Sequence, residues 1–157
     1  MVEDLDYLVK EQTSVTAAEV ITSAQKLEDA SAALYEVLAG KCIEHSERFL
    51  AYARDSRKNK VLVTRTYQET ISDALEACYC FEGLRMADFA FNTQGASKAG
   101  YAETLQMALE LEEQAIRFYL DVAKRSQSLL ATIPQAFKRV AQKRNERKLE
   151  LQSLCDS

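Results

Sequence analysis

The sequence predicts an all-α protein whose helices pack as a single four-helix bundle over residues 1–157. Three observations indicate this class. Glycine and proline are scarce, at four residues and one, which disfavours a β-rich or a disordered chain. Long stretches are dominated by strong helix formers such as Ala, Leu, Glu and Lys. Apolar residues make up 47% of the chain and recur at helical spacing, enough to fill one substantial core.

The first helix is expected to follow a polar lead-in of residues 1–13. Thr13 or Ser14 can cap its N-terminus, because a hydroxyl there accepts a hydrogen bond from a free backbone N–H. The apolar stripe of this helix repeats at 3.6-residue spacing over residues 17–38. Glu28 lies within that stripe, so the pattern places a carboxylate on the face that packs against the other helices.

Gly40 is the expected end of the first helix, and the second is expected to begin near Ile43. The apolar period continues past Gly40, however, and one glycine costs a helix only about 1 kcal/mol. A single long helix is therefore the alternative. The second helix carries its own stripe, which consists of Phe49, Tyr52, Ala53, Ser56, Asn59 or Lys60, and Val63.

A long crossover is expected over residues 64–100. A helical pattern over residues 64–94 predicts an extra helix there, and the glycines and small polar residues of 92–100 predict a loop. The crossover is more apolar than a connection that faces water. Its aromatic residues, Tyr79, Phe81, Phe89 and Phe91, either cover the bundle or form the seam of a homodimer.

Two further helices complete the expected bundle as a second helical hairpin. The third is expected over residues 101–127. Its stripe consists of Leu105, Ala108, Leu109, Glu112, Ala115, Ile116, Tyr119, Val122 and Ala123. Pro134 suits the first turn of the fourth helix, where its missing N–H has no partner. The stripe of the fourth helix consists of Ile133, Phe137, Val140, Ala141, Arg144, Arg147 or Lys148, Leu151 and Leu154.

One short pattern occurs in both halves of the chain. Glu28 precedes Tyr35 by seven residues, and Glu112 precedes Tyr119 by the same interval. Residues seven apart lie two turns apart on one helix face. The pattern predicts two carboxylates that point into the core from two helices, an arrangement that can hold a pair of metal ions. The tyrosines are expected in the core, each with a local partner for its hydroxyl.

These features resemble the rubrerythrin branch of the ferritin-like superfamily. The resemblance covers residues 101–154, with the segments ETLQMALELEEQAIRFYLDVAKRS and IPQAFKRVAQKRNERKLELQSL, and extends more weakly over residues 17–63. It implies a ferritin-like bundle that binds two irons. The implied ligands are a glutamate on each odd helix, at Glu28 and Glu112, and a Glu-x-x-His motif on each even helix.

Four of the six implied ligands are replaced in this chain. The second helix has Ser56-x-x-Asn59 at the matching position, and the fourth has Arg144-x-x-Arg147, or Asn145-x-x-Lys148 with a register shift of one residue. The one histidine, His45, matches no ligand position. Iron needs several carboxylate and imidazole ligands, whereas guanidinium groups repel a cation. A standard di-iron site is therefore not expected, and neither is any other cofactor.

We hypothesise that Arg144 and Arg147 supply the missing positive charge to Glu28 and Glu112 in a buried network. One alternative is that the two glutamates reach water at the edges of the helix interfaces. The other is that they remain metal ligands in an altered iron or manganese site. That site would recruit further carboxylates, such as Glu36, Glu44 or Glu69.

The expected function is that of a structural, binding or assembly protein. This expectation is favoured over an enzymatic function. The alternative is an iron or manganese oxidoreductase, or a metal-binding protein, that uses the altered site. The fourth helix has a basic run that includes Lys138, Arg139 and Lys143. The net charge of the chain is −4, however, and no groove-reading motif accompanies the run, so nucleic acid is not expected as a partner. A homodimer through helical surfaces is the expected assembly.

The composition also predicts a setting. No uncharged apolar run approaches the length of a membrane span, and residues 1–12 do not have the pattern of a signal peptide. The four cysteines, Cys42, Cys78, Cys80 and Cys155, fall outside the CxxC spacing of zinc sites. Free thiols in a reducing cytoplasm are therefore expected.

Overall fold

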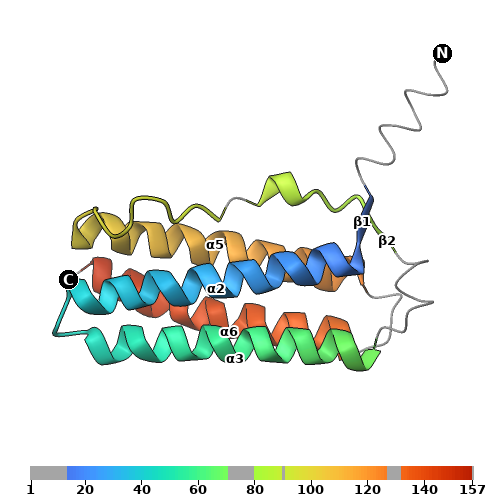
Figure 1. Cartoon of the computed structure of the whole chain (residues 1–157), viewed down its shortest axis with the longest axis horizontal. Helices are drawn as coiled ribbons and strands as arrows, with labels where there is room; N and C mark the ends of the chain where they lie inside the picture. The colour runs from blue at the N-terminus through green and yellow to red at the C-terminus, as the bar shows by residue number, and fades with distance from the viewer. Residues whose placement is uncertain (1–13, 71–79, 90, 127–131, 157) are drawn as a thin grey trace, which may run out of the picture.

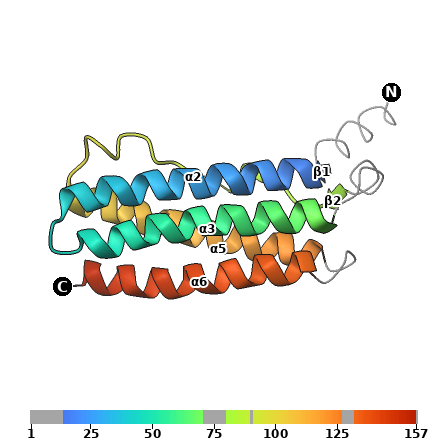
Figure 2. The ribbon, with the colours of Figure 1, turned by 60° about the horizontal axis from the view of Figure 1, so that its bottom comes forward.

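The computed structural model describes residues 14–70, 80–89, 91–126 and 132–156. Four long helices run side by side in this part of the chain (Figures 1 and 2). They are α2 (Ala17–Lys41), α3 (Ser46–Thr70), α5 (Tyr101–Arg125) and α6 (Thr132–Cys155). Two short strands, β1 (Ser14–Thr16) and β2 (Cys80–Glu82), pair antiparallel at one end, and η1 (Met86–Asp88) is a turn of 3-10 helix. The predicted all-α, four-helix class is confirmed.

The helices pack as two hairpins. α2 packs along α3, and α5 packs along α6. The two hairpins meet through contacts of α3 with α6 and of α2 with α5. In Figure 2, α3 lies between α2 and α6 at the front of the bundle. Each helix therefore turns one face toward the centre, and the residues on these faces build the site described below.

The first hairpin has a true break, so the alternative of a single long helix is wrong. α2 ends at Lys41, one residue after Gly40, and α3 begins at Ser46 rather than near Ile43. The backbone of Cys42 is already extended, with φ of −138°. Ile43 is 91% exposed in the connection, because it belongs to neither helical stripe.

The N-cap of α2 is Thr16, and the prediction of Thr13 or Ser14 is wrong. Thr16 Oγ1 accepts from the backbone N–H of Glu19 at 3.2 Å, and Glu19 Oε2 accepts from the backbone N–H of Thr16 at 3.1 Å. This is a capping box, which satisfies two unpaired donors at once. Ser14 instead lies in β1, opposite Glu82 of β2.

The described part of the crossover contains no extra α-helix, so that prediction is wrong for these residues; residues 71–79 lie outside the described part. Residues 64–70 belong to α3, and β2, η1 and a stretch of turns occupy most of the rest. Gly83 adopts φ of +76° directly after β2, a left-handed conformation that interrupts any helix. The predicted loop over 92–100 is confirmed by its turns.

The aromatic residues of the crossover cover the bundle. Phe81 is buried, and the rings of Phe89 and Phe91 meet the ring of Phe118 edge-on, with centroids 5.5 and 6.0 Å apart. Tyr79 lies outside the described residues. This cover helps to bury Phe118 of α5. Leu111 is also buried, whereas two residues of the predicted stripe, Leu109 and Ile116, are only partly so.

Candidate functional site

A cluster of polar side chains lies buried in the middle of the bundle. All four helices contribute to it, and none of its members is more than 4% exposed. Because each member lies on the core stripe of its helix, the packing of the four helices brings them together. The members are Glu28 of α2, Ser56 and Asn59 of α3, Glu112 of α5, and Arg144 and Arg147 of α6.

Arg144 bridges the two glutamates. Its Nη1 donates to both carboxylate oxygens of Glu112, at 2.7 and 2.8 Å. Its Nη2 and Nε donate to the two oxygens of Glu28, at 2.6 and 3.2 Å. All three side chains are fully buried. The planar guanidinium presents its donors in a fork that suits carboxylates, so one positive charge lies between two negative ones.

Two tyrosine hydroxyls donate further hydrogen bonds to the carboxylates, each from a helix of the other hairpin. Tyr35 of α2 donates to Glu112 Oε1 at 2.6 Å, and Tyr119 of α5 donates to Glu28 Oε1 at 2.7 Å. The expectation of a local partner is therefore wrong, because each hydroxyl crosses to the other hairpin. α2 and α5 run antiparallel, so the equal Glu-to-Tyr intervals place each tyrosine beside the glutamate of the other copy.

Arg147 extends the network toward α3. Its Nη1 donates to Glu112 Oε1 at 3.2 Å and to Ser56 Oγ at 3.0 Å. Its guanidinium carbon lies 5.2 Å from the ring centroids of both Tyr35 and Tyr52, a geometry for cation–π attraction. Lys148, which the sequence left as the alternative to Arg147 on the core stripe, is partly exposed, and its Nζ lies 3.7 Å from Glu113 Oε1.

One link of the network was missed from the sequence. Ser31 of α2 and Ser56 of α3 form a buried hydroxyl pair with their oxygens 3.0 Å apart. Ser31 lies three residues after Glu28, on the same face of α2. The sequence offered a signal for this pair, because each serine lies on the core stripe of its helix and a buried hydroxyl needs a hydrogen-bond partner.

The electrostatics of the cluster favour the charged forms of the acid and the base. Burial raises the pKa of Glu112, but Arg144 and Arg147 outweigh it and lower that pKa below its ordinary value. Burial likewise lowers the pKa of Arg144, but the two glutamates raise it well above the ordinary value. Two carboxylates and two guanidiniums thus sum to zero charge in the core.

The tyrosines of the network are held neutral. Burial, and then the negative charge of Glu112, raise the pKa of Tyr35 well above its ordinary value. Burial and Glu28 do the same for the pKa of Tyr119. Each neutral hydroxyl donates a hydrogen bond to its carboxylate.

Alkaline pH is expected to destabilise the fold through these tyrosines. Their folded pKa values are raised, so the stability they contribute is complete below the ordinary tyrosine pKa of about 10 and falls above it. The free energy of unfolding should drop by about 1.4 kcal/mol per pH unit for each tyrosine that stays neutral only when folded. Urea unfolding at a series of pH values measures this slope. Tyr119→Phe should reduce the slope by one tyrosine's share, and an unchanged slope would contradict the assignment.

The side chains at the centre do not fit a metal site. All four carboxylate oxygens of Glu28 and Glu112 accept hydrogen bonds from the network. Within the described ranges, no three His, Cys, Asp or Glu side chains are grouped so that they could hold a metal ion. The suggested extra ligands lie elsewhere: Glu36 pairs with Arg57 on the surface, and Glu44 and Glu69 are exposed.

Asn59 is the imperfectly satisfied member of the cluster. Of the two alternatives on the predicted stripe, Asn59 faces the core. Lys60 lies at the surface, where its Nζ donates to the carboxylate of Asp29 at 2.9 and 3.0 Å. Asn59 Nδ2 is buried and finds no hydrogen-bond partner among the described residues. A buried donor without a partner costs about 1–3 kcal/mol.

Asn59→Leu is therefore expected to raise the free energy of unfolding by about 1 kcal/mol, since an apolar side chain of similar size removes the unpaired donor. Urea unfolding measures the change. Ser56→Ala is the matched control on the next turn of α3, and it should lower stability because it removes the partner of Arg147. A loss of stability in Asn59→Leu would show instead that the amide has a partner, such as an ordered water.

Comparison with protein-family models, with curated proteins and with solved structures finds no match to this chain. Among the described residues, none of the helices combines the length and the apolar character that crossing a membrane requires. The site is a buried, charge-neutral network of hydrogen bonds and ion pairs that connects all four helices.

Proposed function

We propose that the chain is a ferritin-like bundle in which a guanidinium replaces the metal centre, and that it acts as a structural, binding or assembly protein and not as an oxidoreductase. The observation that carries this proposal is the bridge of Arg144 between Glu28 and Glu112. A positive charge already lies between the two carboxylates that the resemblance implies as metal ligands.

The identity of the buried residues supports the same proposal. The six positions that match the implied ligands of the ferritin-like family are all buried and all polar in this chain. A cation drawn to the two glutamates would have to displace a guanidinium that donates four hydrogen bonds to them. It would leave that guanidinium buried without a counter-charge, which is strongly unfavourable.

Metal analysis tests the proposal directly. The protein is produced with iron or manganese added during growth, purified without chelator and analysed for its elemental content. We expect metal far below stoichiometry, and no change of the unfolding temperature when a chelator is added. About two metal ions per chain, as a di-metal bundle holds, would overturn the proposal.

We propose further that the protein forms a homodimer in the cytoplasm. Exposed aliphatic side chains on the second hairpin support association through helical surfaces, with Leu120 at 48% and Leu149 at 58% exposure. The free thiols of Cys42 and Cys155 support a reducing compartment. Sedimentation velocity at micromolar concentration is expected to give a dimer, and a monomer would refute this part of the proposal.

A further inference from the structure

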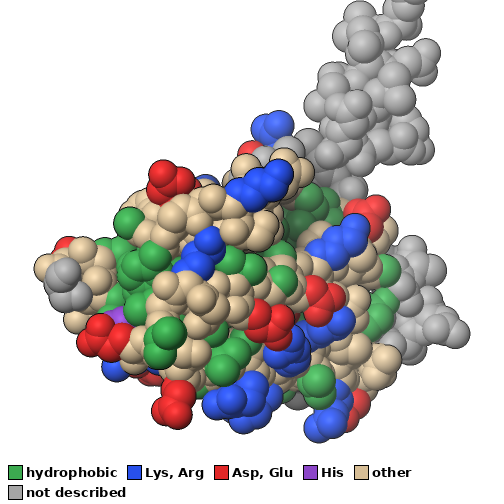
Figure 3. Space-filling view, turned by 60° about the vertical axis from the view of Figure 1, so that its left-hand side comes forward, with side chains coloured by type: hydrophobic (Ala, Val, Ile, Leu, Met, Phe, Trp, Pro, Cys, Tyr) green, Lys and Arg blue, Asp and Glu red, His purple; other side chains and the backbone are tan. Residues whose placement is uncertain are grey.

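The outward face of α3 carries basic and aliphatic side chains in one stripe. Their spacing of three and four residues places them on a single side of the helix. Leu50 and Val61 are 40% and 55% exposed within it. Figure 3 shows Lys and Arg side chains gathered along the lower edge of the molecule, where α3 runs. The stripe consists of Leu50, Arg54, Arg57, Lys58, Val61 and Arg65.

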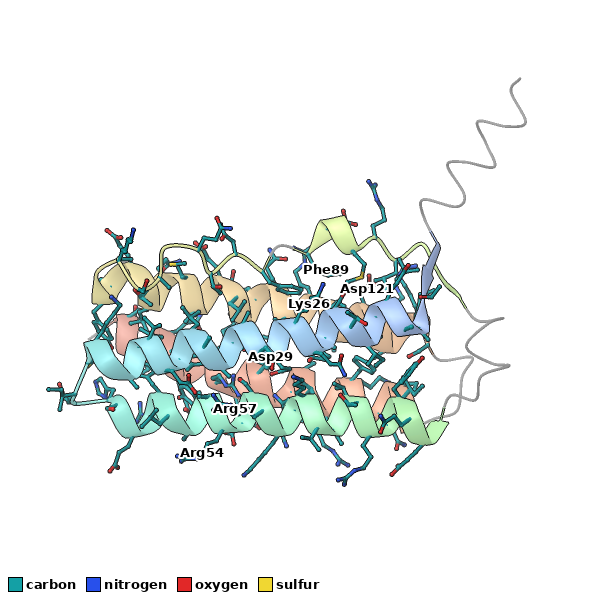
Figure 4. All side chains as sticks on the ribbon, viewed as in Figure 1. Lys26, Asp29, Arg54, Arg57, Phe89 and Asp121 are labelled. Atoms are coloured by element: carbon teal, nitrogen blue, oxygen red, sulfur yellow. The ribbon has the colours of Figure 1, made fainter. Side chains whose placement is uncertain are left out.

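Three of the four cations in the stripe form no salt bridge with a described residue. Arg57 forms an ion pair with Glu36 of α2. Within the described part of the chain, Arg54, Lys58 and Arg65 take part in no salt bridge. In Figure 4, Arg54 points away from the bundle. Such cations give this face a positive charge that an acidic partner would complement.

A groove adjoins the stripe between α2 and α3. Its volume is about 610 Å³, and its lining combines three cations and the carboxylate of Asp29 with a hydroxyl, two amides and an aliphatic side chain. Figure 4 shows Arg57 and Asp29 on the two helices that border it. The lining includes Arg57, Lys60, Val61, Thr64, Arg65 and Gln68.

We propose that this basic face of α3, together with the groove, binds an acidic helical segment of another protein. The carboxylates of such a segment complement Arg54, Lys58 and Arg65, and its apolar side chains cover Leu50 and Val61. The face from Leu50 to Gln68 is about 27 Å long, which a helix of about 18 residues spans. The mode is that of an amphipathic helix laid along a groove.

Nucleic acid fits this surface less well. The stripe has no aromatic side chain on which a base could stack. A phosphate backbone would also leave the aliphatic side chains of Leu50 and Val61 uncovered. The face lies outside the buried network, so its test and the metal analysis are interpreted independently.

Fluorescence anisotropy with a labelled synthetic peptide tests the proposal. The peptide is a helix of about 18 residues, with leucine at every third or fourth position and glutamate elsewhere. The triple variant Arg54→Glu, Lys58→Glu, Arg65→Glu is expected to weaken binding at least about tenfold. The matched control makes the same charge change on exposed residues of α6, Lys138→Glu, Arg139→Glu, Lys143→Glu, and should keep more of the affinity. Thermal unfolding confirms that both variants are folded.

Four outcomes would overturn the proposal. The first is that the full chain does not bind the peptide, and the second is an equal loss of affinity in the two triple variants. The third is tighter binding of single-stranded DNA or of anionic phospholipid vesicles than of the peptide. The fourth is binding that emerges only after removal of residues 1–13, since that segment carries Glu3, Asp4, Asp6 and Glu11 and would then be the occupant.

Discussion

Arg144→Met is expected to lower the free energy of unfolding by about 3–5 kcal/mol, because it leaves the buried carboxylate of Glu28 without a counter-charge and that of Glu112 with Arg147 alone. Glu28 and Glu112 are both fully buried, and Arg144 bonds to each of their four oxygens. Urea is the appropriate denaturant, because guanidinium ions could occupy the vacated place. Arg57→Met is the matched control: its partner Glu36 is exposed, and such surface pairs contribute only about 0–1 kcal/mol.

Removing the carboxylates as well should recover part of that loss. Since Arg144 bridges both glutamates, adding Glu112→Leu alone still leaves Glu28 buried without a counter-charge. The triple variant that adds Glu28→Leu should be more stable than the sum of the three single losses predicts. Strictly additive losses would show that the three side chains do not act as one unit.

The convergence of the charged residues could be predicted because it depends only on helical periodicity. Glu28, Glu112, Arg144 and Arg147 each fall on the apolar stripe of a helix, and a four-helix bundle has one common centre. Two buried acids then require positive charge nearby, and among the predicted core stripes only that of α6 contains basic residues at its centre, Arg144 and Arg147. Local pattern and general electrostatics were sufficient for this part of the site.

The partners of the tyrosines could not be predicted in the same way. Tyr35 bonds to Glu112, 77 residues away, and Tyr119 bonds to Glu28, 91 residues away. These pairs depend on the relative register of α2 and α5, which tertiary packing sets and no local pattern encodes. The amide of Asn59, which is unpaired among the described residues, likewise depends on how the side chains of the core pack together.

In the described part of the crossover, the predicted extra helix is absent because tertiary packing outweighs local helical propensity there. Residues 64–70 extend α3, and beyond them Phe81, Phe89 and Phe91 turn toward the bundle and cover it. Burying aromatic area on α5 contributes more than continuing an isolated surface helix would. Gly83, with its left-handed backbone, makes the change of direction after β2 possible.

Introducing the four ligands that the ferritin-like resemblance implies is expected to turn the buried network into a metal site. The variant combines Ser56→Glu, Asn59→His, Arg144→Glu and Arg147→His, while Glu28 and Glu112 are kept. Four carboxylates and two imidazoles would then converge where two guanidiniums now repel cations, and these donor types suit iron and manganese. We expect about two metal ions per chain, and an unfolding temperature that rises with added metal.

This variant separates a ferritin-like arrangement from a bundle that shares only its class. If the six positions are placed as the resemblance implies, the new ligands will bind metal together with Glu28 and Glu112, and adding Glu28→Gln and Glu112→Gln will abolish binding. Circular dichroism with and without metal distinguishes a lost fold from a lost site. A folded variant that binds no metal would contradict the ferritin-like proposal, even if the parent protein is metal-free, because the two glutamates would then be paired with arginine for reasons of packing alone.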